Sequence, residues 1–385
     1  MAAGREPNMS VIYSIGSKFA GGGIGTTAYH GAYGLYRHGM LRHLLCGAYL
    51  RTEIPSSLIR AMGLPDRVLR RLAVLDSSGW LWYFQSVLFD NWTARHLEAA
   101  DLFHVWGNYG LRSMQRAREM GMMTVLQQAS AHPRYQTRLL VEEYARWGLR
   151  WTAPEVAVRR ALAEIAVADY VLIPSDFVRD TFIAEGVPEA KLIQIPFGAD
   201  TERFRPLPER DDHPFRVLFV GQIGLRKGVP YLLETWRQLG WQDAELWFVG
   251  QVEPVFRPLM RRWEGLAGVK LMGYAPDPVG LYQQADVFVF PTIQEGSALV
   301  TYEALACGLP VVTTPNAGSV LRDGVEGFVV PVRDVKALAA ALERLRADEQ
   351  WRLEMGRAAR VRAEEFTWKK HRDSLAGAYE QLALE

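Results

Sequence analysis

The sequence has few cysteines, few lysines and no long apolar run. Its two cysteines, Cys46 and Cys307, lie far apart among 385 residues, each in apolar surroundings. This excludes the disulfide framework of a small secreted domain, and the simplest interpretation is two buried free thiols in a reducing compartment. No stretch reaches the roughly 18 apolar residues that a membrane-spanning helix needs, and no apolar signal region follows the polar start. We therefore expect a cytoplasmic protein.

Positively and negatively charged residues are present in nearly equal numbers. The net charge is +1, so nothing indicates a nucleic-acid-binding protein. An apolar content of 49% and a charged content of 23% are typical of a globular protein. The length is enough for two ordinary domains with cores of their own.

Strand-like and helix-like stretches alternate along most of the chain, which predicts an α/β architecture with parallel sheets. The first series of expected strands is Ser10–Ser14, Arg42–Ala48, Leu102–Trp106, Met123–Gln127, Tyr170–Pro174 and Leu192–Ile195. Helices are expected between them, for example at Thr26–His38, Leu111–Met120, Thr137–Gly148 and Pro154–Val167. The second series of strands is Arg216–Val220, Glu245–Val249, Val269–Met272, Val287–Pro291, Val311–Thr313 and Gly327–Val330.

Two complete series predict two domains. Residues 196–215, PFGADTERFRPLPERDDHPF, are rich in proline and charge and separate the series as a linker would. We place the domains at residues 1–200 and 201–365. The remaining residues, 366–385, are expected to form a separate amphipathic helix.

The most informative segment is FPTIQEGSALVTYEALACGLPVV, in which Glu295 and Glu303 are eight residues apart. A strand from Asp286 to Pro291 leads through a turn into a helix that starts near Leu299. A doubly wound sheet binds ligands at the carboxyl ends of its strands, and this turn lies at such an end.

This turn combines two kinds of binding group. Exposed backbone N–H groups at Gly296 and Ser297, with the helix dipole behind them, suit a phosphate. The carboxylates of Glu295 and Glu303 would repel a phosphate but accept hydrogen bonds from hydroxyl groups. A site that binds both phosphate and hydroxyls indicates a sugar nucleotide.

A second motif, FVGQIGLRKG, ends a strand and places Arg226 and Lys227 before a helix. A diphosphate leaving group needs either a divalent metal or fixed cations. No Asp-x-Asp pair stands at a strand end, and Asp211 and Asp212 lie in the linker, where a solvated turn is the simpler interpretation. We therefore expect the two cations to replace a metal, and no cofactor.

Five signatures occur in order: IPFGADTERF, FVGQIGLRKGV, FVFPTIQEGSALVTYEALACGLPVV, RDGVEGFVVP and FTWKKH. Together they resemble the retaining glycosyltransferases of GT-B fold and family 4 type, such as phosphatidylinositol mannosyltransferases, sucrose-phosphate synthases and bacterial glycogen synthases. The resemblance implies two Rossmann-like domains facing a cleft, with the last helix packing back on the first. It also implies that the first domain binds the acceptor and the second a nucleotide-sugar donor, and that the acceptor hydroxyl attacks from the leaving-group side.

The resemblance assigns roles to single residues. Glu295 would contact the transferred sugar and Glu303 the ribose hydroxyls, while Arg226 and Lys227 would bind the pyrophosphate. The donor contacts would also include the start of the helix and a glycine pair, namely Gly296, Ser297, Leu299, Gly22 and Gly23. Two positions depart from the family pattern: Gln222 stands where an arginine is common, and Ser297-Ala298 is smaller than usual.

His132, in QQASAHPRYQ, follows an expected strand of the first domain. A lone histidine is usually structural, but the resemblance implies a histidine beside the reacting sugar at this point. Arg134, Tyr135 and Glu143 are further candidates for acceptor or donor contacts.

Other functions remain open on this sequence. The N-terminal SIGSKFAGGGIGTT lacks the G-x-G-x-x-G spacing, and no acid ends the next strand, which counts against an NAD-dependent oxidoreductase. A phosphorylase would need a lysine for pyridoxal phosphate, and none of the seven lysines stands out. An epimerase of the same fold and a non-catalytic nucleotide-sugar-binding subunit are the remaining alternatives.

Two segments raise the question of partners. Residues 56–75 are basic and amphipathic, through Arg60, Arg67, Arg70 and Arg71, which predicts either peripheral membrane contact or a solvated helix face. The aromatic cluster Trp80–Phe84, with Trp92, is expected in the core rather than on an acceptor or lipid surface. We expect a UDP-, GDP- or ADP-sugar as the donor, and a saccharide, a lipid or a small molecule as the acceptor.

Overall fold

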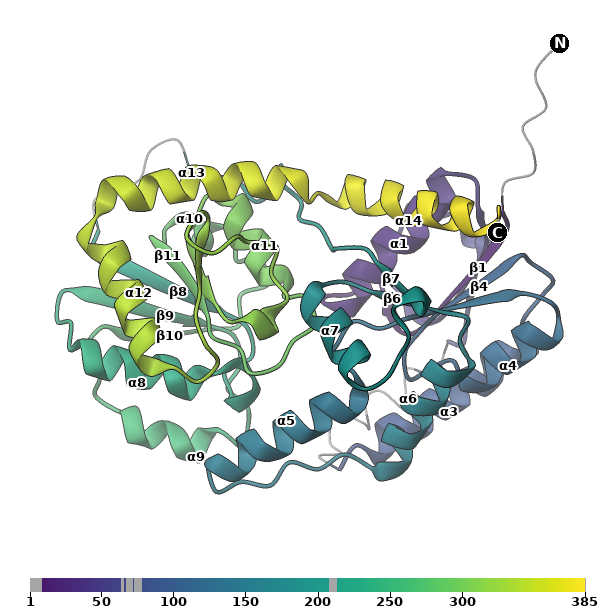
Figure 1. The fold of residues 1–385 in the computed structure, drawn as a ribbon, viewed down its shortest axis with the longest axis horizontal. Helices are drawn as coiled ribbons and strands as arrows, with labels where there is room; N and C mark the ends of the chain where they lie inside the picture. Colours follow the sequence, from purple (N-terminus) through teal and green to yellow (C-terminus); the bar gives the residue numbers. More distant parts are fainter. Residues whose placement is uncertain (1–8, 64–65, 67–71, 73–77, 208–212, 385) are drawn as a thin grey trace, which may run out of the picture.

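The computed structural model describes residues 9–63, 66, 72, 78–207 and 213–384, and its first half is a seven-stranded parallel sheet. The strand order is β3-β2-β1-β4-β5-β6-β7 (Figure 1). The strands are β1 (Val11–Phe19), β2 (Leu41–Tyr49), β3 (Ile59–Ala61), β4 (Leu102–Trp106), β5 (Met123–Gln127), β6 (Tyr170–Ile173) and β7 (Leu192–Gln194). The described helices that cover the sheet are α1 (Ile24–Arg37), α3 (Trp80–Arg95), α4 (Leu111–Glu119), α5 (Pro133–Arg146), α6 (Glu155–Val167) and α7 (Asp176–Ala184).

The second half is a six-stranded parallel sheet in the order β10-β9-β8-β11-β12-β13. Its strands are β8 (Phe215–Val220), β9 (Ala244–Val249), β10 (Val269–Gly273), β11 (Val287–Phe290), β12 (Val311–Thr313) and β13 (Gly327–Val329). Its helices include α8 (Val229–Leu239), α9 (Arg257–Met260), α10 (Val279–Gln283), α11 (Leu299–Ala306), α12 (Val335–Ala347) and α13 (Glu349–Glu365). The α/β class with two parallel, Rossmann-like sheets is therefore confirmed.

The strands form where apolar and β-branched residues run together. All four residues of β11 and all three of β12 are buried, as expected of parallel strands covered on both faces by helices. Each sheet has its own buried core, one built around Tyr13, Phe103 and Leu126 and the other around Phe219, Phe288 and Val312.

The end of the chain crosses between the domains. Helix α13 covers the second domain and α14 (Trp368–Leu382) continues over the first, along the upper edge in Figure 1. Leu375 and Tyr379 of α14 lie in the first core, and α14 packs on α1. Where the linker passes this crossover, Ala199 N donates to Phe366 O at 3.0 Å. Two segments, the linker and the α13–α14 crossover, therefore connect the domains on this side.

The solvated helix face expected for the basic segment 56–75 is wrong for residues 56–61. Ser56–Leu58 form a 3-10 turn and Ile59–Ala61 form the edge strand β3, so this part is not a helix face. Arg60 pairs with Glu98, Nη2 to Oε1 at 2.6 Å. Arg67, Arg70 and Arg71 lie outside the described residues.

The aromatic cluster is also placed differently from the expectation. Trp80, Trp82 and Phe84 of α3 are 47%, 37% and 52% exposed, whereas Trp92 packs against the first core. The helix buries a polar face instead, because Asp90 accepts hydrogen bonds from the N–H groups of Arg112 and Ser113 at the start of α4, both at 2.8 Å. Apolar character alone did not identify the buried face.

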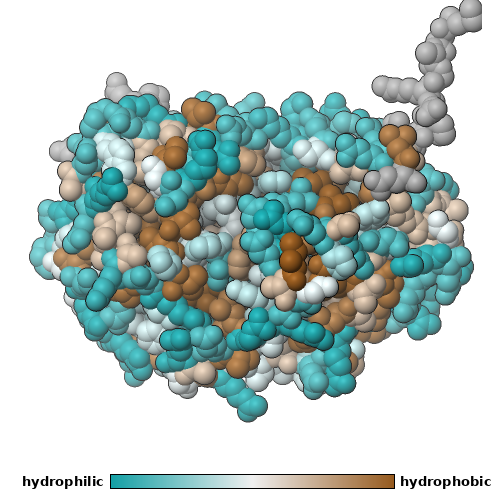
Figure 2. Space-filling view, viewed as in Figure 1, coloured by the Kyte–Doolittle hydropathy of each residue, from teal (hydrophilic) through white to brown (hydrophobic). Residues whose placement is uncertain are grey.

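None of the described helices is both long and apolar enough to span a bilayer. On the face seen in Figure 2, apolar side chains gather in the middle of the molecule and hydrophilic ones cover most of its periphery. In the same view, the middle is where the two domains meet (Figure 1).

Candidate functional site

The carboxyl ends of β8 and β11, which are neighbours in the second sheet, carry two turns that are bonded to each other. The turn after β8 is the 3-10 segment Leu225–Lys227, and the turn after β11 contains Glu295. Ile293 N and Thr292 Oγ1 both donate to the carbonyl oxygen of Arg226, at 2.9 and 3.0 Å. These bonds hold the two turns as one unit, so the side chains that they carry have fixed relative positions.

Gly228 makes this close approach sterically feasible. It caps the start of α8 with φ 70°, and a Cβ there would lie 1.8 Å from the carbonyl oxygen of Pro291. Gly228→Ala is therefore expected to lower the free energy of unfolding by about 3 kcal/mol, from backbone strain and displaced backbone. Chemical denaturation measures this.

The matched control is Gly240→Ala, at the other end of the same helix. Gly240 has φ 60° but open space around its missing Cβ. Its substitution should cost about 1 kcal/mol, the conformational cost alone. Equal losses for the two variants would contradict the steric argument.

The two cations and the first glutamate form one cluster. Arg226 Nη1 lies 3.1 Å from Glu295 Oε1, and Lys227 pairs with the other carboxylate oxygen. Lys227 is nearly buried, and its side chain also lies over the ring of Phe290, 5.2 Å from the centroid. Burial and the positive charge of Arg226 lower the pKa of Lys227 well below its usual range. The structure thus brings Arg226, Lys227 and Glu295 together.

A second carboxylate, Glu253, which the sequence interpretation missed, lies beside the same cations. Glu253 follows β9 and its Oε2 atom is buried, without a hydrogen-bond partner among the described residues. Burial raises the pKa of its carboxyl, and Arg226 and Lys227 offset part of that rise. Burial and Glu253 in turn raise the pKa of Tyr144, on α5, to about 12. The signal was available, because Glu253 also follows a strand of the second sheet at its carboxyl end.

Glu303 lies in α11 with a partner of its own. Its Oε2 atom accepts a hydrogen bond from the hydroxyl of fully buried Tyr282, at 2.8 Å. Burial raises the pKa of Glu303, while the bond from Tyr282 and the charge of Arg203 lower it. The carboxylate is therefore fixed in position rather than solvated on an outer helix face.

The expectation of exposed N–H groups at Gly296 and Ser297 is wrong for this closed arrangement. Both residues are buried, and a Cβ on Gly296 would lie 1.7 Å from the carbonyl oxygen of Ala129 in the first domain. Ser175 Oγ donates to Gly296 O at 2.6 Å, and Ser297 Oγ lies 2.9 Å from Tyr302 OH. Leu299, the first residue of α11, is half-buried. The first domain thus covers the start of this helix.

His132 stands at the N-cap of α5, in the loop that covers this turn. Gln294 Nε2 donates to Ser130 Oγ of that loop at 2.6 Å. The imidazole of His132 is 3% exposed and packs edge-on against Phe182, with centroids 5.0 Å apart. Its Nδ1 atom is buried and has no hydrogen-bond partner in the described part of the chain. Burial lowers the pKa of His132, so the ring is neutral near pH 7.

The glycine pair lies in an open turn of the first domain. Gly22 and Gly23 are exposed in the turn between β1 and α1, and Gly23 has φ 62°. A Cβ on either residue would meet no atom within 4 Å. No part of the second domain therefore packs against the Cβ side of this turn.

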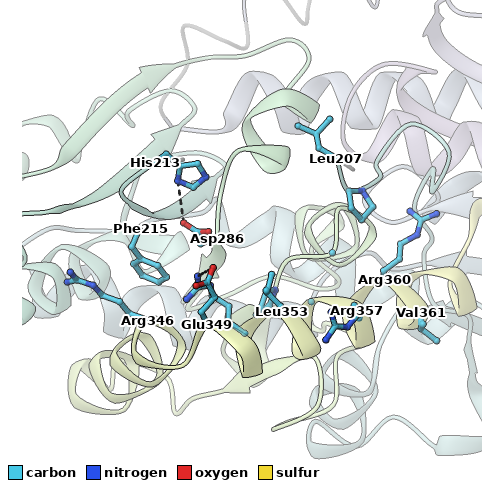
Figure 3. Close-up of a pocket in the computed structure, with 15 residues that line it drawn as sticks. Leu207, His213, Phe215, Asp286, Arg346, Glu349, Leu353, Arg357, Arg360 and Val361 are labelled. Carbon is cyan, nitrogen blue, oxygen red and sulfur yellow. Dashed lines mark ion pairs between the residues drawn. The ribbon is translucent and has the colours of Figure 1, made fainter. Parts of the chain in front are cut away.

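A cavity of about 1120 Å³ lies at the opposite edge of the second sheet (Figure 3). It is bounded by the linker, by α13 and by the amino ends of strands, with Phe215 opening β8 and Asp286 preceding β11. Arg346 pairs there with Asp243 at 2.7 Å, and Arg360 donates to three backbone carbonyls. The cavity shares no residue with the Glu295 cluster.

Within the described ranges, no three His, Cys, Asp or Glu side chains are grouped so that they could hold a metal ion. Metal independence itself stays a prediction.

Comparisons with known proteins relate part of this chain to a family of transferases. Residues 214–348 match the family model Glycosyl transferases group 1. The D-inositol 3-phosphate glycosyltransferase of Corynebacterium jeikeium is 30% identical over 242 residues, which cover 56% of this chain and 58% of that protein. The chain spans about half the length of the curated relatives it matches.

Solved structures share the whole fold. The sucrose-phosphate synthase of Thermosynechococcus elongatus superposes with a TM-score of 0.68 at 19% identity, over 98% of this chain and all of that one. Anabaena HepE, solved with UDP and glucose, superposes with a TM-score of 0.67 at 16% identity, over 97% and 99% of the two chains. Residues 214–348 thus match the family model Glycosyl transferases group 1, within a chain that has the two-domain GT-B fold.

Proposed function

We propose that this protein is a retaining, metal-independent glycosyltransferase that moves a sugar from a nucleotide-sugar donor to an acceptor hydroxyl. The observation that carries the proposal is the cluster of Arg226, Lys227 and Glu295 at the carboxyl ends of two adjacent strands. This cluster supplies the two kinds of group that a sugar diphosphate needs: cations that bind the phosphates and a carboxylate that binds the sugar hydroxyls.

The donor would bind mainly to the second domain and the acceptor to the first. A UDP-sugar is the first donor to test, because solved structures of the similarly folded Anabaena HepE contain UDP and UDP-glucose. GDP- and ADP-sugars are the alternatives. A saccharide, a lipid or a small molecule would be the acceptor. A cytoplasmic location and peripheral membrane contact through residues 56–75 stay predictions.

In the proposed reaction, the donor phosphates take the place of Glu295 beside Arg226 and Lys227, and the freed carboxylate accepts bonds from the sugar. The acceptor oxygen forms a bond to the anomeric carbon on the face from which the phosphate oxygen leaves. The acceptor proton passes to that phosphate oxygen, so no side-chain nucleophile is required. Neutral His132 offers its unpartnered Nδ1 atom as a hydrogen-bonding group from the first domain.

The contacts across the cleft would protect the donor from water. Ser130 and Ser175 of the first domain bond to Gln294 and Gly296 on either side of Glu295. Exclusion of water strengthens the charge interactions in the site and prevents hydrolysis of the donor.

A thermal-shift screen with UDP, GDP, ADP and their sugar conjugates, with and without EDTA, tests the donor site. A bound nucleotide raises the melting temperature by mass action. We expect one base to be preferred and EDTA to leave its shift unchanged. A shift that EDTA removes would overturn the metal-free part of the proposal, and no shift with any nucleotide would overturn the donor site.

Glu303→Gln is expected to weaken binding of the preferred nucleotide by roughly tenfold to a hundredfold, because a bond to a charged acceptor contributes about 1.5–3 kcal/mol. Isothermal titration calorimetry measures the change. Glu343→Gln, which removes an exposed acid from α12, is the control and should bind as the wild type does. Equal affinity of the Glu303 variant and the wild type would contradict the ribose-binding role.

A further inference from the structure

Helix α5 contacts both domains, and it lies along the lower side of the molecule in Figure 1, below the junction of the two sheets. Its first half contacts the first domain, where Tyr135 packs against Phe177 with centroids 6.1 Å apart and Arg138 pairs with Glu185 at 3.0 Å. Its second half belongs to the other core: Leu140 and Tyr144 are buried among residues of the second domain. Just past the helix end, Trp147 packs against Tyr231 and Trp263.

At the centre of the second half, Glu143 has no exposed surface and receives three hydrogen bonds. Its Oε1 atom accepts from Trp147 Nε1 at 3.0 Å and from Tyr231 OH of α8 at 2.8 Å. Its Oε2 atom accepts from Arg333 Nε at 2.6 Å. Two of the three donors come from the second domain, so one buried carboxylate joins the domains.

The arginine partner is held in an unusual conformation. Arg333 lies between β13 and α12 with φ 69°, a left-handed backbone that is costly for a residue with a side chain. Such strain persists only where the surroundings hold it, and here the guanidinium also reaches Glu142 Oε1 at 2.9 Å. The loop is thus shaped to present Arg333 to α5.

The contact of Glu143 with Arg333 and Tyr231 lies far from the covalent connections between the domains. The linker and the α13–α14 crossover connect the domains along one side, and α5 lies on the other (Figure 1). A contact far from the connection opposes a hinge opening most effectively. We propose that Glu143 is a positioning residue, a latch that holds the cleft closed through Arg333 and Tyr231.

The chemistry of the pair suits a reversible latch. Removing two ions from water costs nearly as much free energy as their attraction returns, so a buried pair is close to balance with two hydrated ions. Removal of Glu143 is different, because Arg333, whose side chain is only 19% exposed, then keeps the half-exposed Glu142 as its one remaining acidic partner. Glu143→Gln should therefore favour the arrangement in which Arg333 reaches water, which is the open cleft.

Distances between spin labels test the latch without any substrate. Both native cysteines are buried, so cysteines introduced at exposed Gln115 on α4 and Gln238 on α8 can be labelled selectively. These helices belong to different domains and lie on opposite sides of the molecule in Figure 1. We expect Glu143→Gln to shift the distribution to longer distances, with the ratio of open to closed molecules rising roughly tenfold or more. A distribution identical to that of the wild type would overturn the proposal.

The matched control is Glu142→Gln, which removes the neighbouring charge that pairs with the same arginine but is half exposed. It should leave the distances unchanged. If Glu142→Gln opens the cleft as much as Glu143→Gln, net charge rather than the buried contact holds the domains, and the proposal fails.

A second variant separates the latch from simple loss of folding. Arg333→Gly removes the pair from the other side and also relieves the positive φ, so the domains should stay folded while the cleft opens. Once a donor is known, both variants should raise its KM more than they lower kcat, since fewer molecules are in the closed form. Arg333→Gly with unchanged label distances would overturn the latch even if Glu143→Gln did not fold.

Discussion

Replacing Glu295 with glutamine is expected to lower kcat/KM for sugar transfer by roughly 10²- to 10³-fold, the range found when one preorganised polar group is removed from an active site. The same substitution should leave binding of the free nucleoside diphosphate unchanged or make it tighter. Kinetics with the preferred donor and calorimetry with the nucleotide alone measure the two quantities.

These opposite effects follow from the two roles of the carboxylate. In the structure, the Glu295 carboxylate forms ion pairs with Arg226 and Lys227, so a diphosphate that binds these cations must displace the carboxylate. Glutamine cannot hold the cations as strongly and removes that competition. During transfer, however, the carboxylate would contact the sugar, and the amide does not carry the charge that stabilises a positively charged anomeric centre.

Glu253→Gln is the comparison that separates the roles. Glu253 lies beside the same cations but on the segment after β9, away from the turn that carries Glu295. Glu253→Gln should leave nucleotide affinity unchanged or raise it, as Glu295→Gln does, while kcat stays within about threefold of the wild-type value. Equal losses of kcat in both variants would show that the charge of the cluster, rather than contact with the sugar, governs the rate.

Much of the fold was predictable because its signals are local. Leu102–Trp106, Met123–Gln127 and Val311–Thr313 are strands with the predicted bounds, since each is a short apolar run between turn residues. The helix near Leu299 also begins where predicted. Arg226, Lys227 and Glu295 could be proposed as one site because the carboxyl ends of parallel strands all lie at one edge of the sheet.

What could not be predicted depends on contacts between distant segments. The environment of Glu143 comes from α8 and from the loop before α12, and nothing in the sequence around α5 indicates either. The burial of Gly296 is set by Ala129 of the other domain. The exposure of Trp80 and Phe84 also depends on a distant segment, because a polar contact of Asp90 with α4 decides which face of α3 is buried.

Lys227→Met is expected to abolish the thermal shift by the preferred nucleotide and to lower kcat/KM by at least roughly 10²- to 10³-fold. Methionine has a similar length and suits the apolar contact with Phe290, so the packing of the turn is retained. Burial disfavours the charge on Lys227, and Arg226 still pairs with Glu295 in the variant, so the loss of this lysine should lower the melting temperature of the free protein far less than it weakens donor binding. This variant should therefore lose donor binding while it keeps most of its stability.

Lys270→Met, which removes an exposed lysine from β10, is the control and should behave as the wild type in both assays. The decisive addition is Mg²⁺. If the reaction depends on a cation fixed at this position, Mg²⁺ bound by the diphosphate should not restore transfer in the variant. Rescue of Lys227→Met by Mg²⁺ would instead mean that neutralising the charge of the diphosphate is sufficient for the reaction. The placement of the diphosphate against Arg226 and the turn after β8 would then not limit the rate. Persistent loss would place the leaving-group role on the lysine itself, since no other change was made to the site.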